Sequence, residues 1–98
     1  MVVLGIDPGT ALTGYGFIRL AENGDLSVID YGVISTPAKT AMENRLVQLY
    51  QEINEKILLH HPERGAVEKL FFHTNVTTAI SVGQARGVIL LCMAQAGI

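Results

Sequence analysis

Residues 2–9 of the sequence read Val-Val-Leu-Gly-Ile-Asp-Pro-Gly. The apolar run has the length of a buried β-strand, and the Pro-Gly pair that follows it is typical of a chain reversal. Asp7 therefore stands at the end of a strand that lies in the core. A carboxylate in such a place is costly to desolvate unless it is paired or binds a cation. The segment predicts a strand that presents an acid at its end, where ligands of such sheets usually bind.

Two further strands are expected directly after the first one. Residues 13–20 and 26–34 are mainly apolar, and the turn between them carries Asn23-Gly24, a strong hairpin signal. The first third of the chain should therefore form an antiparallel meander.

The periodicity then changes to that of a helix. Thr40 and Glu43 have the spacing of a capping box, and His60-His61-Pro62 ends the pattern. Adjacent side chains on a helix point in different directions, so we interpret the two histidines as solvent-exposed or as partners of the helix C-terminus, not as a metal pair. The apolar stripe of this helix comprises Met42, Leu46, Leu49, Tyr50, Ile53 and Ile57.

A strand and a second helix complete the pattern. Residues 65–68 read as a short strand, which the helical crossover would place parallel to an earlier one. The second helix is expected from near Thr77 to about Gln95. Ala79, Gly83 and Gly87 form a row of small side chains on it, which indicates packing either on the chain's own sheet or against a partner helix in a dimer. The expected order is βββαβα.

Composition limits the classes of protein that fit. The chain has 98 residues, of which 49% are hydrophobic and 16% charged, so it holds one domain at most and is too apolar for a disordered chain. This apolar content suggests contact with another subunit or with a further part of the same domain. The single cysteine, Cys92, excludes an internal disulfide and fits a core position in a protein of a reducing compartment.

No targeting or membrane segment is evident in the sequence. The N-terminus lacks a basic region before its apolar run, and the longest apolar run, residues 88–93, is far shorter than the roughly 20 residues of a membrane span. We therefore expect a soluble, cytoplasmic protein. The net charge of −2 counts against a nucleic-acid partner, because lysines and arginines supply most of the affinity for phosphates.

Glu68 repeats the pattern of Asp7 at the end of the last strand. Local explanations exist for both: Asp7 could cap its own turn, and Glu68 could be a surface residue paired with Lys69. Two acids at neighbouring strand ends, however, suit Mg²⁺, and two such ions about 4 Å apart can cleave a phosphodiester. Two carboxylates are too few to hold two metal ions, so further acids would be needed.

Three motifs together resemble one known family, the RuvC-type Holliday junction resolvases. Gly5-Ile6-Asp7-Pro8-Gly9-Thr10 with Thr13-Gly14-Tyr15-Gly16 resembles its first-strand motif. Its second and third signatures are matched in order and spacing by Val67-Glu68, Phe71-Phe72, Asn75 and Gly83-Gln84-Ala85-Arg86-Gly87-Val88. The resemblance covers nearly the whole chain. It implies a ribonuclease H-like α/β fold over residues 1–98, truncated before its last strand and helices, and a metal-dependent endonuclease.

The resemblance also implies roles for single residues. Asp7 and Glu68 would be two of the four acids that hold two Mg²⁺ ions, which Mn²⁺ can replace, and the other acids would lie beyond Ile98. Phe71 would wedge against bases at the junction; on local evidence it would be a core residue. Asn75 would be a junction contact as well as an N-cap. Arg86 would be either a phosphate contact or a structural partner for an acid.

The partners follow from the same resemblance. They are four-way junction DNA, a second copy of the chain, and a branch-migration motor complex of RuvA and RuvB. The activity would be paired nicking that leaves 5′-phosphates and 3′-hydroxyls during recombination and repair, by a chain whose catalytic site is incomplete as given. One departure is His73-Thr74, where relatives often carry a lysine.

Two other functions fit parts of the sequence. An ATP-binding module of the actin and sugar-kinase type also opens with an acid at a strand end and a glycine-rich hairpin. That family needs a second domain and a second phosphate loop, which 98 residues cannot hold. A non-catalytic junction-binding or dimerisation fragment would need only the folded core.

Overall fold

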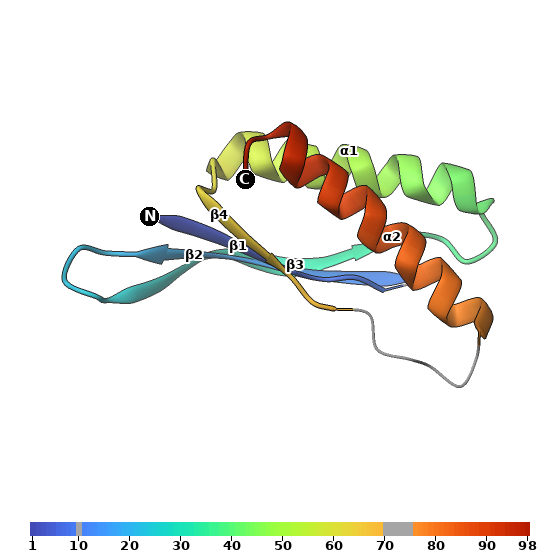
Figure 1. The fold of residues 1–98 in the computed structure, drawn as a ribbon, viewed down its shortest axis with the longest axis horizontal. Coiled ribbons are helices and arrows are strands. Elements are labelled where there is room, and N and C mark those ends of the chain that lie inside the picture. Colours follow the sequence, from blue (N-terminus) through green and yellow to red (C-terminus); the bar gives the residue numbers. More distant parts are fainter. Residues whose placement is uncertain (10, 70–75) are drawn as a thin grey trace.

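The computed structural model describes residues 1–9, 11–69 and 76–98. Within these ranges the elements follow the expected βββαβα order (Figure 1). Their bounds are β1 Val2–Asp7, β2 Leu12–Leu20, β3 Leu26–Ser35, α1 Met42–His60, β4 Arg64–Val67 and α2 Val76–Gln95.

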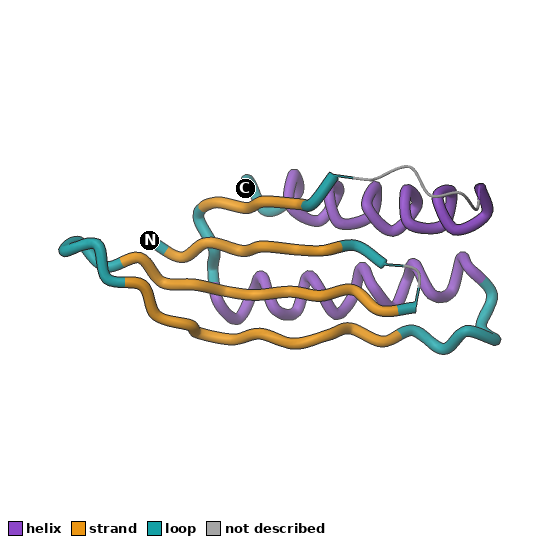
Figure 2. The backbone as a smooth tube through the Cα atoms, turned by 90° about the horizontal axis from the view of Figure 1, so that it is seen from below, coloured by secondary structure: helices purple, strands orange, loops and turns teal. Residues whose placement is uncertain are grey.

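The strands form one sheet in the order β3-β2-β1-β4. The strand β2 is antiparallel to both β1 and β3, whereas β4 is parallel to β1. Figure 2 shows the four strands side by side, with β4 reached only after the chain has passed through α1. The predicted meander and the predicted parallel crossover are both confirmed.

Both helices cover the same face of the sheet (Figure 1). Side chains that alternate along each strand meet the buried faces of the helices there, which explains the single apolar core. The buried core residues are Leu4, Ile6, Phe17 and Ile34 from the sheet, Leu49, Ile53 and Ile57 from α1, and Ala85, Ile89, Cys92 and Met93 from α2. Cys92 is a core residue, as expected.

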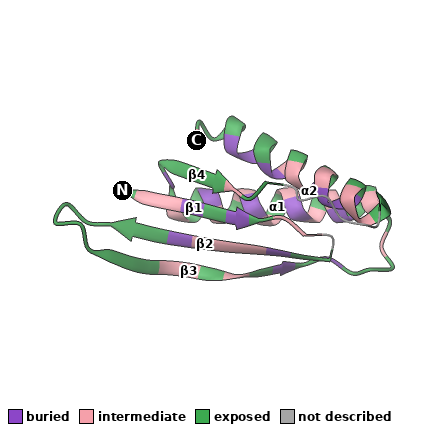
Figure 3. Ribbon diagram, turned by 60° about the horizontal axis from the view of Figure 1, so that its bottom comes forward, coloured by how far each residue is buried: buried purple, intermediate pink, exposed green. Residues whose placement is uncertain are grey.

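The other face of the sheet carries exposed apolar side chains, and Figure 3 shows stretches of exposed residues along β2, β3 and β4. The set comprises Leu12, Ile18, Leu20, Leu26, Val28, Tyr31 and Val33. In β2 and β3 the alternation of the pleat sends these side chains away from the helices. Contact of this face with another subunit or with a further part of the same domain, expected from the composition, stays a prediction.

The beginning of α1 differs from the sequence-based expectation. The N-cap residue is Ala41, and no side chain caps the helix. The N–H of Thr40 instead donates to the carbonyl of Pro37, over 3.1 Å. The predicted capping box is therefore wrong, because Thr40 lies in a turn before the helix. The end of the helix is as predicted, with His61 in the left-handed conformation at the C-cap.

His60 lies in the last turn of α1, and the expectation of solvent exposure holds for His61 but not for His60. Its side chain is 14% exposed, and its Nε2 lies 3.0 Å from Oδ2 of Asp30 on β3. The ring centroids of His60 and Phe17 are 4.5 Å apart. Thirty residues separate His60 from Asp30, so the pairing could be seen only once α1 was placed on the sheet.

The helix α2 is apolar on most of its surface. By length and composition alone it could cross a membrane, but a core helix passes the same test, and here one face packs into the core. Gly87 is exposed, and a Cβ built on it would meet nothing within 4 Å. At this position the row of small residues therefore does not pack on the chain's own sheet.

Candidate active site

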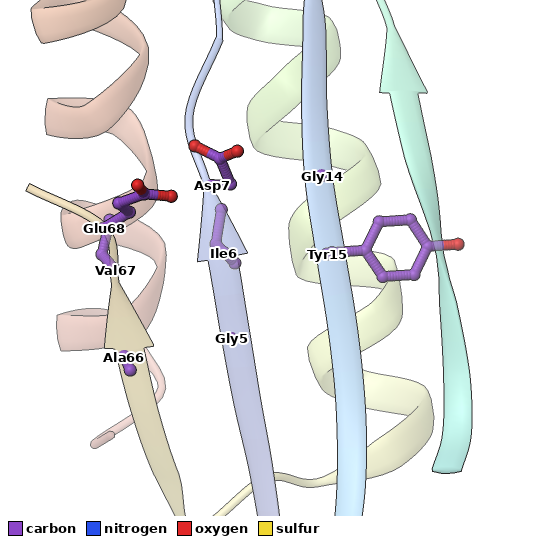
Figure 4. A pocket seen from close by; sticks show the side chains of 8 residues that line it. All are labelled: Gly5, Ile6, Asp7, Gly14, Tyr15, Ala66, Val67 and Glu68. Atoms are coloured by element: carbon purple, nitrogen blue, oxygen red, sulfur yellow. The ribbon is translucent and has the colours of Figure 1, made fainter. Parts of the chain in front are cut away.

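The two acids singled out in the sequence come together through the register of β1 and β4. Ile6 pairs with Val67 in the parallel ladder, and the N–H of Glu68 donates to the carbonyl of Ile6 over 2.9 Å. Asp7 and Glu68 are the next residues along the two chains. Because parallel strands end at the same edge of a sheet, both acids stand at that edge, side by side (Figure 4).

Both acids belong to the face of the sheet that the helices do not cover. Ile6 is buried under the helices, and the alternation of side chains along the strand turns its neighbour Asp7 to the opposite face. Asp7 and Glu68 line an open groove of about 460 Å³. Gly5, Gly14 and Ala66, which have little or no side chain, line it together with Ile6, Tyr15 and Val67.

The proximity of the two acids changes the acidity of one of them. A side-chain hydrogen bond with Asp7, the negative charge of Asp7 and partial desolvation raise the pKa of Glu68 above its ordinary value of 4.5. Two carboxylates that repel one another in this way are stabilised by a divalent cation, which would bind their oxygens. The donor set therefore fits a hard cation such as Mg²⁺.

The raised pKa of Glu68 predicts a pH-dependent stability. A carboxyl that binds its proton more tightly in the folded than in the unfolded chain stabilises the fold at low pH, and this contribution is lost as the pH rises through the raised pKa. In metal-free buffer we expect Asp7→Asn to raise the unfolding temperature at neutral pH, because it removes the repulsion. The gain in unfolding temperature should shrink below the ordinary pKa of Glu68.

Thermal unfolding at several pH values measures this gain, with Glu22→Gln in the hairpin as the control. An equal change at every pH would contradict the prediction.

A buried arginine on α1 supports Ala11, the residue before β2, through Thr36. Nε of Arg45 donates to Oγ1 of Thr36 over 3.0 Å, and the N–H of Thr36 donates to the carbonyl of Ala11, also over 3.0 Å. Between β1 and β2, a Cβ on Gly9 would collide with the carbonyl of Leu12. The turn therefore needs glycine at this position, as the tight chain reversal predicted.

Sequence reasoning missed Arg45, which is 8% exposed. The signal was present, because Arg45 lies three residues after Met42 and four before Leu49, on the apolar stripe of the helix. A charged residue on such a stripe indicates a buried polar partner.

Arg86 reaches the site from α2. Its Nε donates to the backbone carbonyl of Glu68 over 3.2 Å. Of the two expected roles, this geometry favours a structural partner for an acid over a phosphate contact. The hydrogen bond goes to the backbone of Glu68 and not to its carboxylate. Phe71 and Asn75 lie outside the described residues, so their expected roles stay predictions.

Within residues 1–9, 11–69 and 76–98, no group of three or more histidine, cysteine or acidic side chains could hold a metal ion together. Within the described residues the site is a pair of acids, and the expectation that Asp7 and Glu68 supply part of a larger metal site stays a prediction.

Comparison with known proteins gives the family. Residues 3–98 match the profile described as crossover junction endodeoxyribonuclease RuvC. The chain belongs to the RuvC family. It is 52% identical over all its 98 residues to the RuvC of Heliobacterium modesticaldum, and 55% identical to that of Desulfitobacterium hafniense. The chain spans about 60% of the length of these relatives, covering 60% of the first and 59% of the second.

A solved RuvC structure shows the same arrangement of elements. The Thermus thermophilus RuvC in complex with a Holliday junction substrate matches the whole chain with a TM-score of 0.91 at 28% identity, over 62% of that structure's own chain. The ribonuclease H-like fold expected from the three motifs is thereby confirmed. So is the family that these motifs indicated.

Proposed function

We propose that the protein carrying this chain is a Holliday junction resolvase, an endonuclease that makes paired nicks in four-way DNA junctions. The observation that carries the proposal is the pair Asp7 and Glu68, brought side by side at one edge of the sheet in a chain of the RuvC family. The Thermus thermophilus relative was solved with a Holliday junction substrate, which supports the choice of DNA.

Asp7 and Glu68 would hold Mg²⁺, with Mn²⁺ as a substitute. When bound, the metal supplies a Lewis acid that activates water and stabilises the leaving oxygen of the phosphodiester. Two ions per site would require more carboxylates than these two, and we place the others beyond Ile98. The open groove and its small lining residues leave room for the DNA backbone above the acids.

The reaction is hydrolysis of one phosphodiester by in-line attack of water, which leaves a 5′-phosphate and a 3′-hydroxyl. The chain's own contribution is geometric. The β1–β4 register, continued by the hydrogen bond from the N–H of Glu68 to the carbonyl of Ile6, brings the two carboxylates side by side.

The net charge of −2 does not exclude DNA at this site, because the basic residues are unevenly placed. Arg64 and Lys69, two of the seven lysines and arginines, lie at the start of β4 and directly after Glu68. Phosphates can therefore meet positive charge beside the acids. By family resemblance Phe71 would stack on junction bases, and Asn75 would contact the junction.

Cleavage of a synthetic four-way junction tests the proposal. The protein extended to the length of its relatives should cut the junction in Mg²⁺ or Mn²⁺, leave linear duplex intact, and release 5′-phosphate ends. The 98-residue chain, tested beside it, should not cut. Equal cutting of duplex and junction would contradict the resolvase, and absence of cutting together with nucleotide binding would favour the ATP-binding alternative.

We further propose that the protein acts as a homodimer, with one site for each of two opposing strands. The outward side of α2 supports this, because exposed apolar residues recur on it at helical spacing. Val76, Ile80 and Leu91 are 69%, 57% and 49% exposed, and Gly87 lies between the last two in open space. Such a stripe is typical of helix-to-helix packing between subunits.

A charge placed on this stripe should separate the subunits. Ile80→Glu is expected to convert the dimer into monomers, because a carboxylate would have to be desolvated at the centre of the interface. Sedimentation velocity measures the mass. The matched control is Val47→Glu, which places the same charge on an exposed apolar position of α1. A variant of Ile80 that stays dimeric would place the interface elsewhere.

Junction resolution also implies a cellular setting. We place the protein in the cytoplasm, in DNA recombination and repair, with a branch-migration complex of RuvA and RuvB as its partner. A fragment that binds junctions without cutting them is the second candidate function. It is favoured by the two-acid site of the described residues, and the comparison of the 98-residue chain with its extended form separates the two.

A further inference from the structure

Glu68 lies just beyond the end of β4 and is not part of the strand. The strand β4 ends at Val67, one residue before it, and the side chain of Glu68 is exposed beside the like-charged Asp7. The charge of Asp7 favours separation of the two carboxylates. A metal site needs the opposite, because both sets of oxygens must stay near one cation.

Two hydrogen bonds to its backbone hold Glu68 in place. Its N–H donates to the carbonyl of Ile6 on β1 over 2.9 Å, and its carbonyl accepts from Nε of Arg86 over 3.2 Å. One bond comes from the sheet and the other from α2, so they fix both ends of the residue. Arg86 lines a groove with Val67 and Leu90, which shows that its side chain lies between β4 and α2.

The guanidinium acts on the backbone of Glu68 and leaves its carboxylate available. The hydrogen bond that the structure gives between Arg86 and Glu68 goes to the backbone carbonyl of Glu68. An arginine paired with the carboxylate itself would compete with a metal ion for the same oxygens. A bond to the carbonyl avoids this competition.

We propose that Arg86 is a positioning residue for Glu68, fixing the backbone of this acid to α2 so that its carboxylate stays beside Asp7. This role rests on the function proposed above only as far as Glu68 is a metal ligand. It differs from a phosphate contact, because it acts in the absence of DNA.

The test uses the protein extended to the length of its relatives, without DNA. Arg86→Leu keeps the apolar part of the side chain next to α2 and removes the donor. Amide hydrogen exchange should become faster at Glu68, because the residue loses one of its two backbone anchors, while the global unfolding temperature changes little. Binding of Mn²⁺, measured by calorimetry, should weaken about tenfold, as for other groups that orient a metal ligand. Lys69→Leu is the control: it removes the neighbouring positive charge and should leave both readouts unchanged.

The outcomes separate the possible roles of Arg86. If Arg86→Leu leaves exchange at Glu68 and Mn²⁺ affinity unchanged but weakens junction binding, Arg86 is a phosphate contact and the proposal is overturned. If Lys69→Leu weakens Mn²⁺ binding as much, the loss is not specific to Arg86 and the proposal is again overturned. If exchange at Glu68 responds as expected while even the unaltered protein binds no Mn²⁺, Arg86 positions Glu68 but the proposed metal site fails.

Discussion

Asp7→Asn and Glu68→Gln are each expected to reduce junction cutting by on the order of 10³-fold, because each would remove a carboxylate from the proposed cation that activates the water. Both replacements keep the size and shape of the side chain, and both lie on an exposed edge of the sheet. Binding of the junction should therefore persist, and should strengthen slightly as a negative charge is lost near the phosphates.

Rates of strand cutting in Mg²⁺ and junction affinity in Ca²⁺ or without metal measure the two effects separately. Glu22→Gln replaces an acid in the β2–β3 hairpin, away from the ends of β1 and β4 at which Asp7 and Glu68 lie. This variant should cut at the unaltered rate. Cutting by Asp7→Asn at a comparable rate would show that Asp7 is no ligand. Loss of binding together with cutting would indicate that the acids hold the fold or the DNA and not the metal.

Phe17→Ala is expected to lower the free energy of unfolding by about 3–5 kcal/mol, a large part of the roughly 5–15 kcal/mol that holds a typical domain together. Phe17 is 1% exposed and lies under α1, with its ring 4.5 Å from that of His60 and in an edge-on contact with Tyr15. Truncation would leave a cavity at the junction of β2 and α1.

Urea unfolding followed by circular dichroism measures this loss. Leu26→Ala, at a 69% exposed position of β3, is the control and should change stability by less than about 0.5 kcal/mol. A loss below about 1 kcal/mol for Phe17→Ala would mean that the core described between sheet and helices does not carry the fold.

The acids could be predicted from the sequence because each follows an apolar strand. Asp7 was marked by a strand that ends in Pro-Gly, and Glu68 by a strand after a helical crossover. A crossover fixes the direction of the strand after it, so the carboxyl ends of the two strands had to meet at one edge. The motifs then gave the family, which the comparisons confirmed.

The contacts that hold the acids could not be predicted in the same way. Glu68 and Arg86 are 18 residues apart in the sequence. The hydrogen bond between the carbonyl of Glu68 and the side chain of Arg86 depends on the angle at which α2 crosses β4. The pairing of His60 with Asp30 likewise depends on how α1 lies on the sheet. The expected cap at Thr40 is wrong because residue spacing carries no information about the path of the preceding loop. In that loop the N–H of Thr40 donates to the carbonyl of Pro37. Side-chain contacts between distant elements follow from packing, which periodicity does not describe.

The central claim is that Asp7 and Glu68 hold one divalent cation between them. Anomalous diffraction from crystals of the protein soaked in Mn²⁺ tests it most directly, because the signal marks the metal itself. We predict a peak about 2–2.5 Å from carboxylate oxygens of both residues, at the edge where β1 and β4 end. A metal peak bound elsewhere, or none at this edge under conditions in which the junction is cut, would contradict the account.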